Sequence, residues 1–562
     1  MTWSPSLNPT SSMFWSVILA LLPILAIFWA LIIRKMPGHL ASMLAMAVAF
    51  IVACTVYHMP FKLAVFSTTY GIIYGLFPVC WIVVNALFLF NIIVKSGQFE
   101  LIKQFISGIT TDQRLQVLLI AFSFGAFLEG TAGYGAPVVI TAAMLAGLGF
   151  KPLYAAGICL IANTAPVAYG AVGIPIIVLS QISGLPEMAV SQMVGRTLPL
   201  LSLLLPFYLI AIMAGPKQIK SVFPALFVSG ISFAVLQWFS SNYLGPTLPD
   251  IIAGIGSLVA LLLFLKYWKP KKSWKTAGNQ TVFASPVNRT PKSLVFKAFS
   301  PFLLLTLFIM LWGVPAVREH LDQLGSLAAA MPGIHHVLQD PQGQPVAKII
   351  QFNYLSTPGT AILFASLLAL PIIKLSFRKA IFIYLATLRQ LKYALLTISF
   401  IMGFAYLLND SGITLTLAMA MANTGVLFPF FAPILGWFGV FITGSDTSSN
   451  ALFGKLQYET AQKIGINPLI TVAANASGGV VGKMISPQSI AVAAAGGGLI
   501  GQEFQLLRFT LKHSFILLLL ICLIVLLQAY VFDFIIPNAS SMLSTHQGQN
   551  IRDLADIQTL LK

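Results

Sequence analysis

Two acidic residues stand in apolar, glycine-rich stretches of this chain. Glu129 lies in FLEGTAGYGAP, with no Lys or Arg within 14 residues on either side, and Asp446 is the only acid in TGSDTSSNA. An ionised carboxylate in such surroundings is costly, so burial favours the neutral form and allows the group to bind and release a proton. We therefore expect Glu129, together with Asp446, to couple proton movement to another event. In the structural alternative, the Glu129 carboxyl group hydrogen-bonds to its own glycine-rich turn.

The two stretches belong to a repeated pattern. Both open with F-G-x-F-x-x-G-[ST], at Phe124 and Phe438, and both are followed by N-x6-G-x4-P, at Asn163 and Asn475. The interval from the opening Phe to the closing Asn is 39 residues in the first copy and 37 in the second. Broken, polar backbone at membrane depth is tolerated only where it is buried in protein or lines a cavity. A matched pair of such breaks is the best sequence indication of a transporter's substrate site.

Polar residues around both breaks are candidates for contact with a small anionic substrate. They are Thr131, Gly133, Tyr134, Asn163 and Thr164 in the first copy, and Ser445, Thr447, Ser448, Ser449 and Asn475 in the second. The hydroxyl groups of the second copy can hydrogen-bond a hydroxy acid or coordinate a sodium ion. Ser, Thr, Asp and Asn are also typical caps of half-helices, and a half-helix N-terminus itself attracts a carboxylate. Tyr134 also fits a packing role, and close packing of small residues is the alternative for the breaks.

Lys483 is the cation best placed to meet a translocated anion. It lies between Gly482 and Met484 in an apolar stretch of the second break. We expect its ammonium group to pair with the substrate carboxylate or with Asp446. The alternative is a lysine near a span end, whose stem lies along apolar surface while its amine reaches water.

The elements that position these residues must be membrane-spanning helices. The chain has 562 residues, of which 58% are hydrophobic and 8% charged, and its mean hydropathy is +0.89. Soluble domains carry about 25% charged residues. Apolar runs such as 14–33 are long enough to cross the bilayer core, and they predict roughly 12–14 crossings. We therefore expect an all-α polytopic membrane protein. No catalytic or zinc-binding motif is present, so we expect neither an enzyme nor a cofactor.

The net charge of +17 is explained by membrane topology. Eight Lys and Arg residues lie between 266 and 297 without any Asp or Glu, whereas 317–348 holds acids and few cations. Because positive loops stay cytoplasmic, we expect the first loop inside and the second outside. Contact with anionic membrane lipid is a secondary expectation, and nucleic acid is not an expected partner.

Charge also predicts that the two copies are inverted in the membrane. The arm of the first copy carries Lys95, Lys103 and Arg114, whereas residues 410–436 contain no Lys or Arg. Inverted repeats around a midplane site are used for alternating access. We expect the following parts: N-terminal helices at 1–69, a first repeat at 70–215, linking helices at 216–392, a second repeat at 393–508, and a final helix with a tail at 509–562.

Four long motifs resemble the bacterial L-lactate permease family. They read FLEGTAGYGAPVVITAAMLAGLGFKPLYAAG, NTAPVAYGAVGIPI, TGSDTSSNALFGKLQ and GGVVGKMISPQSIAVAAA, and the resemblance extends over about residues 14–534. It implies proton-coupled uptake of a small 2-hydroxymonocarboxylate, L-lactate or glycolate, across the inner membrane. It also implies re-entrant hairpins, broken helices and an elevator-like movement.

Other transport classes remain open from the residues themselves. The hydroxyl-rich SDTSSN segment is also compatible with a sodium-coupled carboxylate transporter, and a channel is not excluded by composition. Lactate and glycolate differ by one methyl group, which leaves no readable motif, and the sequence does not determine the oligomeric state.

Overall fold

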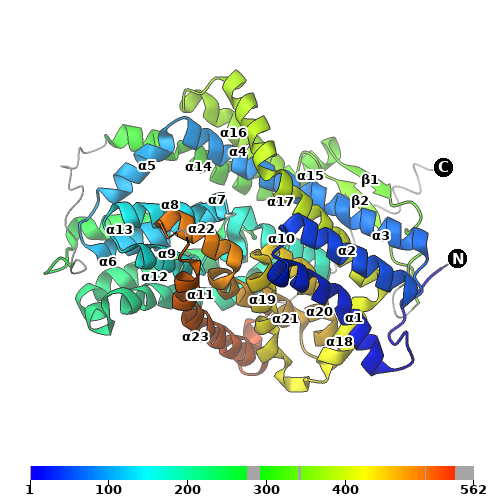
Figure 1. The fold of residues 1–562 in the computed structure, drawn as a ribbon. Helices are drawn as coiled ribbons and strands as arrows, with labels where there is room; N and C mark the ends of the chain where they lie inside the picture. Colours follow the sequence, from blue (N-terminus) through cyan, green and yellow to red (C-terminus); the bar gives the residue numbers. More distant parts are fainter. Residues whose placement is uncertain (1, 134, 275–290, 340–342, 500, 538–562) are drawn as a thin grey trace.

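The computed structural model describes residues 2–133, 135–274, 291–339, 343–499 and 501–537, and Figure 1 shows that they form a helical molecule. Eleven helical stretches of this part are long and apolar enough to cross a membrane, or up to thirteen if each of two bent helix pairs is one span. In a membrane, helices satisfy their own backbone hydrogen bonds, which is why apolar sequence of this length adopts them. The predicted all-α polytopic class is confirmed.

The N-terminal half contains most of the first polar region. Its helices are α1 (Met13–Phe28), η1 (Trp29–Ile33), α2 (Gly38–Thr55), α3 (Phe61–Tyr74), η2 (Gly75–Cys80), α4 (Trp81–Lys95), α5 (Gln98–Ser107), α6 (Gln113–Gln116), η3 (Val117–Phe124), α7 (Gly125–Thr131), α8 (Ala136–Gly147), α9 (Pro152–Ala162), η4 (Val167–Tyr169), α10 (Gly170–Ser183), α11 (Glu187–Ala214), η5 (Pro216–Gln218), α12 (Ile219–Tyr243) and α13 (Pro249–Tyr267).

The C-terminal half contains the second polar region and a small sheet. Its elements are α14 (Lys292–Gly313), α15 (Pro315–Leu324), β1 (Leu327–Ala330), β2 (Ile349–Phe352), α16 (Pro358–Ile372), α17 (Phe377–Ser411), α18 (Ile413–Ala422), η6 (Gly425–Leu427), α19 (Phe428–Thr443), α20 (Asp446–Ile464), α21 (Pro468–Gly482), η7 (Lys483–Ile485), α22 (Pro487–Gly497), α23 (Glu503–Tyr530) and η8 (Asp533–Ile535). The strands β1 and β2 pair antiparallel, with Leu327 opposite Phe352.

Both polar regions are built from a helix pair followed by a bent helix pair. In the first, α7 turns into α8, and the pair at 152–162 and 167–183 is bent by 65°. In the second, α19 turns into α20, and the pair at 468–485 and 487–497 is bent by 48°. The first bend follows Asn163 and Pro166, and the second falls at Ser486, directly before Pro487. Pro lacks an N–H and so favours a break there. Asn475, in contrast, lies within α21 and does not begin the second break.

The two polar regions pack against each other rather than standing apart. The last helix of the second region, α22, packs on α8 and α9 of the first, and Figure 1 shows α8, α9 and α22 side by side. In return, α10 of the first region packs on α20 and α21 of the second. Residues more than 300 positions apart in the chain are brought together by this exchange.

One predicted boundary differs from the structure. The sequence separates a span at 393–408 from an amphipathic connection carrying Arg378, Lys379, Arg389 and Lys392. The structure forms a single helix α17, from Phe377 to Ser411. No Pro lies in this stretch and its only Gly is Gly403, so the backbone has no reason to stop at the charged residues.

Close packing of α19 on α21 yields a stability prediction. A Cβ atom added at Gly436 would collide with the backbone carbonyl of Asn475, which cannot rotate away. We expect Gly436→Ala to destabilise the protein by about 1–3 kcal/mol, as overpacked cores do, and to lower the midpoint of thermal unfolding in detergent. Gly147→Ala is the matched control, because nothing lies within 4 Å of the added atom. Equal midpoints for the two variants would contradict the packing.

Candidate functional site

Glu129 and Lys483 form a buried ion pair between the two polar regions. Nζ of Lys483 lies 2.5 Å from Oε1 of Glu129, and the exposed fractions of the two side chains are 11% and 3%. Nδ2 of Asn163 donates a hydrogen bond of 3.0 Å to the other oxygen, Oε2 of Glu129. Both oxygens of this carboxylate therefore have a partner. The sequence proposes the substrate or Asp446 for Lys483, and the structure gives Glu129 as its ion-pair partner.

The local backbone explains how three distant residues meet. Glu129 lies on α7, Asn163 is the residue that ends α9, and Lys483 begins the single turn η7. Gly170 lies against the carboxylate, since a Cβ atom there would stand 2.8 Å from Oε1 of Glu129. The glycine of the first break thus leaves the space that the ion pair occupies.

Asp446, the second acid, accepts the last hydrogen bond of a chain of two asparagine amides. Nδ2 of Asn450 donates to Oδ2 of Asp446 over 3.3 Å and to the carbonyl of Pro175 over 3.1 Å. Nδ2 of Asn475 in turn donates to Oδ1 of Asn450 over 2.8 Å. Oδ1 of Asp446 has no hydrogen-bond partner among the described residues. Asp446 also lies in the first turn of α20, where the helix dipole favours a negative charge.

The two Asn residues of the repeated motif differ in how they reach the buried acids. Asn163 reaches the acid of its own region directly, and Asn475 reaches Asp446 through Asn450. Both Asn side chains are buried, with 5% and 0% of the residue exposed. The recurrent Asn is therefore buried in both regions, but only Asn163 contacts the acid of its own region directly.

Several of the predicted hydroxyl groups bond to backbone carbonyls, Thr131 and Thr164 within their own stretch of chain and Ser449 to the neighbouring helix α19. Their acceptors are carbonyl oxygens: Phe127 for Thr131 at 3.0 Å, Ile161 for Thr164 at 2.6 Å and Gly436 for Ser449 at 3.0 Å. The hydroxyl of Ser445 caps α20 by accepting from the amide of Ser448 over 3.3 Å. Thr447 is half-buried on the same helix, Gly133 adopts a φ of +57°, and Tyr134 lies outside the described residues.

Electrostatics extend the ion pair into a cluster of one cation and three acids. Besides Glu129, both Asp446 and Asp250 interact electrostatically with Lys483. All three acids are buried, with 3%, 3% and 1% of the residue exposed. Full ionisation would give the cluster three negative charges against one positive charge, and uncompensated charge is costly away from water. The cluster is therefore suited to hold protons and to exchange one when a further anion arrives.

Asp250 is the member of the cluster that the sequence analysis missed. It lies in the first turn of α13, and the residue is 1% exposed. A signal was present: Asp250 is the only charged residue between Lys220 and Lys266. An isolated acid next to an apolar run deserves the same scrutiny as Glu129, because an intramembrane ionisable residue indicates a functional site.

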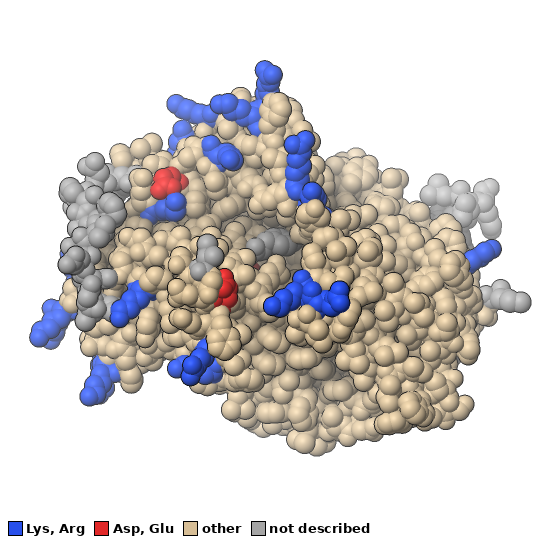
Figure 2. All heavy atoms as spheres, viewed as in Figure 1, with Lys and Arg blue, Asp and Glu red and all other residues tan. Residues whose placement is uncertain are grey.

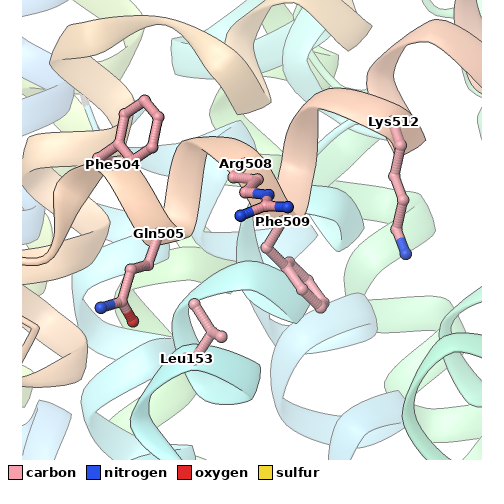
Figure 3. Close-up of a pocket in the computed structure, with 6 residues that line it drawn as sticks. All are labelled: Leu153, Phe504, Gln505, Arg508, Phe509 and Lys512. Atoms are coloured by element: carbon pink, nitrogen blue, oxygen red, sulfur yellow. The ribbon is translucent and has the colours of Figure 1, made fainter.

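The charges at the surface form a different pattern. Figure 2 shows many more Lys and Arg than Asp and Glu side chains on the face in view. A pocket of about 400 Å³ lies at the surface between α23 and α9. Figure 3 shows its lining residues: Leu153, Phe504, Gln505, Arg508, Phe509 and Lys512. None of these residues belongs to the buried cluster, so the pocket is separate from the candidate site.

Comparison with known proteins decides the family. The sequence profile described as L-lactate permease matches residues 16–532, a range that holds both polar regions and all four charged residues of the cluster. The chain belongs to the L-lactate permease family. The resemblance inferred from the four motifs is thereby confirmed.

Full-length relatives in this family support the assignment. The chain is 49% identical over 563 residues to the L-lactate permease of Bacillus subtilis, covering 96% of this chain and 100% of the relative. It is 46% identical to the glycolate permease GlcA of Escherichia coli, covering 95% and 99%, and 46% identical to the L-lactate permease of the same organism, covering 95% and 100%. Among solved structures, MtrF of Neisseria gonorrhoeae, described among antimetabolite efflux pumps, has a TM-score of 0.44 at 16% identity over 82% of this chain and 84% of that one.

Family membership settles the class of this protein. As a member of the L-lactate permease family, it is a transport protein and not an enzyme. Its apolar helices place it in the bacterial inner membrane as a multi-pass protein.

Proposed function

We propose that this member of the L-lactate permease family is a secondary active transporter that takes up L-lactate and related 2-hydroxymonocarboxylates, such as glycolate, together with protons. The substrate class is supported by relatives named as L-lactate and glycolate permeases. The coupling is supported by one observation, the buried pair of Lys483 with Glu129 at 2.5 Å. Each partner of this pair can bind one of the transported species: Lys483 can bind the substrate anion in place of Glu129, and Glu129 can bind the proton.

Charge balance links the two exchanges. When the carboxylate of lactate takes Lys483, Glu129 loses its cation, and a buried carboxylate without a partner binds a proton. The loaded site then contains one ion pair, lactate with Lys483, and one neutral acid, Glu129. The empty site also contains one ion pair, Glu129 with Lys483. Loaded and empty forms therefore carry the same net charge.

Partly loaded forms lack this balance. An anion without a proton adds one negative charge to the buried cluster, and a proton without an anion leaves Lys483 unpaired. Both states are costly in a low-dielectric interior, so the carrier crosses either fully loaded or empty. By linkage, the proton raises the affinity for lactate by the factor by which lactate raises the affinity for the proton.

Asn163 and Asp446 complete the proposed chemistry. Nδ2 of Asn163 donates to Oε2 of Glu129, and this bond suits a carboxylate and the carbonyl oxygen of a protonated acid alike. Asp446 interacts electrostatically with Lys483, so we propose it as the second proton-coupling residue. Glu129 is the first, because it forms the ion pair that the substrate must open.

The two polar regions fit an inverted repeat that moves as one body. Each region packs its broken helix on the other. The arm of the first region carries Lys and Arg and that of the second carries none, as expected if the two regions have opposite orientations in the membrane. We propose that this interlocked body carries substrate and proton across together, in an elevator-like movement.

Transport by purified protein in proteoliposomes tests the coupling. We expect labelled L-lactate to accumulate in sodium-free buffer when the lumen is alkaline, and a protonophore to abolish the accumulation. Sodium should have no effect. A requirement for sodium with indifference to the protonophore would identify a sodium-coupled carboxylate transporter instead. Counterflow into preloaded vesicles separates a carrier from a channel, since a passive pore gives no transient accumulation.

A further inference from the structure

Asp250 is a buried acid whose two carboxylate oxygens make no hydrogen bond to the described residues. The residue is 1% exposed. It lies in the first turn of the 19-residue helix α13. A buried polar group without a partner costs free energy, so each such group in a native structure calls for an explanation.

Asp250 lies against the helix that carries Glu129, within electrostatic range of the proposed substrate cation Lys483. It interacts electrostatically with Glu129 and with Lys483. Its backbone lies against α7, because a Cβ atom added at Gly130 would stand 2.8 Å from Cβ of Asp250. Gly130 directly follows Glu129, so the glycine lets α13 bring Asp250 close to the backbone of α7 at the position of Glu129.

The remaining neighbours of Asp250 have partners of their own. Gln237 of α12 lies next to the Asp250 carboxylate. Its amide oxygen accepts from Ser202 over 2.8 Å and one of its two N–H groups donates to the carbonyl of Ala165 over 3.0 Å, so its second N–H is the one that faces Asp250. Tyr169, the titratable group facing it from η4, donates its hydroxyl to the carbonyl of Ser191 over 2.7 Å. Gln237 can therefore satisfy at most part of the carboxylate, and both oxygens of Asp250, which have no hydrogen bond among the described residues, retain capacity for a ligand.

We propose that Asp250 recognises the 2-hydroxyl group of the substrate and sets the preference for 2-hydroxy acids. This inference rests on the proposed function, in which the substrate carboxylate pairs with Lys483. In a 2-hydroxy acid the hydroxyl group stands on the carbon next to the carboxylate, so an acid beside Lys483 can reach it. The hydroxyl donates to an ionised Asp250 and also bonds to a neutral one.

Asp446 is the weaker candidate for this role. Its Oδ2 already accepts from Asn450, and a Cβ atom added at Gly479 would collide with its Oδ1. Asp250 offers two unpartnered oxygens where Asp446 offers one. A site built to bond a hydroxyl group rejects an analogue that lacks it, because its buried polar groups are then unpaired.

Competition with propionate measures this recognition directly, since propionate is lactate without the hydroxyl group. The readout is the ratio of the two inhibition constants against counterflow of labelled L-lactate. We expect lactate to compete about 100-fold better than propionate in the wild type, the cost of leaving a buried polar group without its partner. Asp250→Val, of similar size but without polar atoms, should lower the ratio at least about 10-fold, mainly by weakening lactate. Asp250→Asn should keep most of the ratio, because the amide still donates and accepts.

Two further variants keep the test decisive. Gly130→Ala should also lower the ratio, because the added methyl group displaces Asp250. Ser257→Ala, on the same helix α13 but bonded to Ser229 and Ser123, should leave it unchanged. A wild-type ratio near one, or equal loss of both ligands in Asp250→Val, would overturn the role of Asp250. Absence of lactate counterflow in the wild type would instead overturn the proposed function.

Discussion

Glu129→Gln is expected to abolish proton-driven accumulation of L-lactate while sparing exchange of lactate across the membrane. The amide cannot bind a proton, but it imitates the protonated acid and leaves Lys483 free for the substrate. The loaded variant therefore has the charge of the loaded wild type, and it can cross in both directions during exchange.

The empty form of this variant is the one that fails. Lys483 is then buried without an anion, and an unpaired buried charge costs about 3–5 kcal/mol. Return of the empty carrier should slow by about 100-fold or more, which removes net uptake. The measurement is paired: accumulation under an alkaline-lumen gradient, and counterflow into vesicles preloaded with lactate.

A second Lys–Glu pair provides the matched control. Glu459 lies 3.1 Å from Lys455 on α20, and both side chains are partly exposed, at 18% and 30%. Such pairs contribute about 0–1 kcal/mol, so Glu459→Gln should retain both accumulation and exchange. Acidification of the lumen during lactate entry by Glu129→Gln would refute the role of Glu129 as the coupling acid.

The helix breaks were predictable from sequence because their causes are local. Asn163 and the following Pro166 end α9, and Gly482 with Pro487 brackets η7. Pro and Gly act on their own turn of helix whatever the rest of the chain does. The same local logic gave helix capping as the alternative role of Ser445, and the structure shows Ser445 as the N-cap of α20.

The partner of Lys483 was not predictable, because it depends on packing over a separation of 354 residues. The sequence shows an isolated acid and an isolated cation, but several acids are equally isolated. The packing of α22 on α8 and α9 helps bring η7 to α7. That packing depends on the shape of small apolar side chains, which hydrophobic periodicity does not report.

Asp250 was missed for a different reason. It opens an apolar run at Pro249–Tyr267, and an acid in the first turn of a helix is stabilised by the helix dipole anywhere. Sequence alone therefore cannot separate an acid at a membrane surface from an acid inside the site. Burial and contact with Gly130 make the distinction.

Lys483→Met is expected to remove exchange as well as accumulation, unlike Glu129→Gln. The substrate carboxylate loses its cation, and Glu129 is left buried beside an apolar side chain. Removing one partner of a buried pair destabilises a protein by about 3–5 kcal/mol, or by less where the remaining acid binds a proton. Counterflow of labelled lactate should fall to the level of vesicles without protein. The midpoint temperature of thermal unfolding in detergent should be lower than that of the wild type.

The double variant Glu129→Gln/Lys483→Met separates the stability of the pair from its function. Neither buried charge remains, so unfolding should return toward the wild-type midpoint, above that of Lys483→Met alone, while counterflow stays absent. Lys455→Met is the control for the chemical change, because its partner Glu459 is partly exposed and its loss should cost about 1 kcal/mol or less. Counterflow that survives in Lys483→Met would show that the substrate anion binds elsewhere. If the shift of the unfolding midpoint in the double variant equals the sum of the shifts in the two single variants, the two charges do not stabilise each other. Restored folding without restored transport would show that the pair serves transport beyond its contribution to stability.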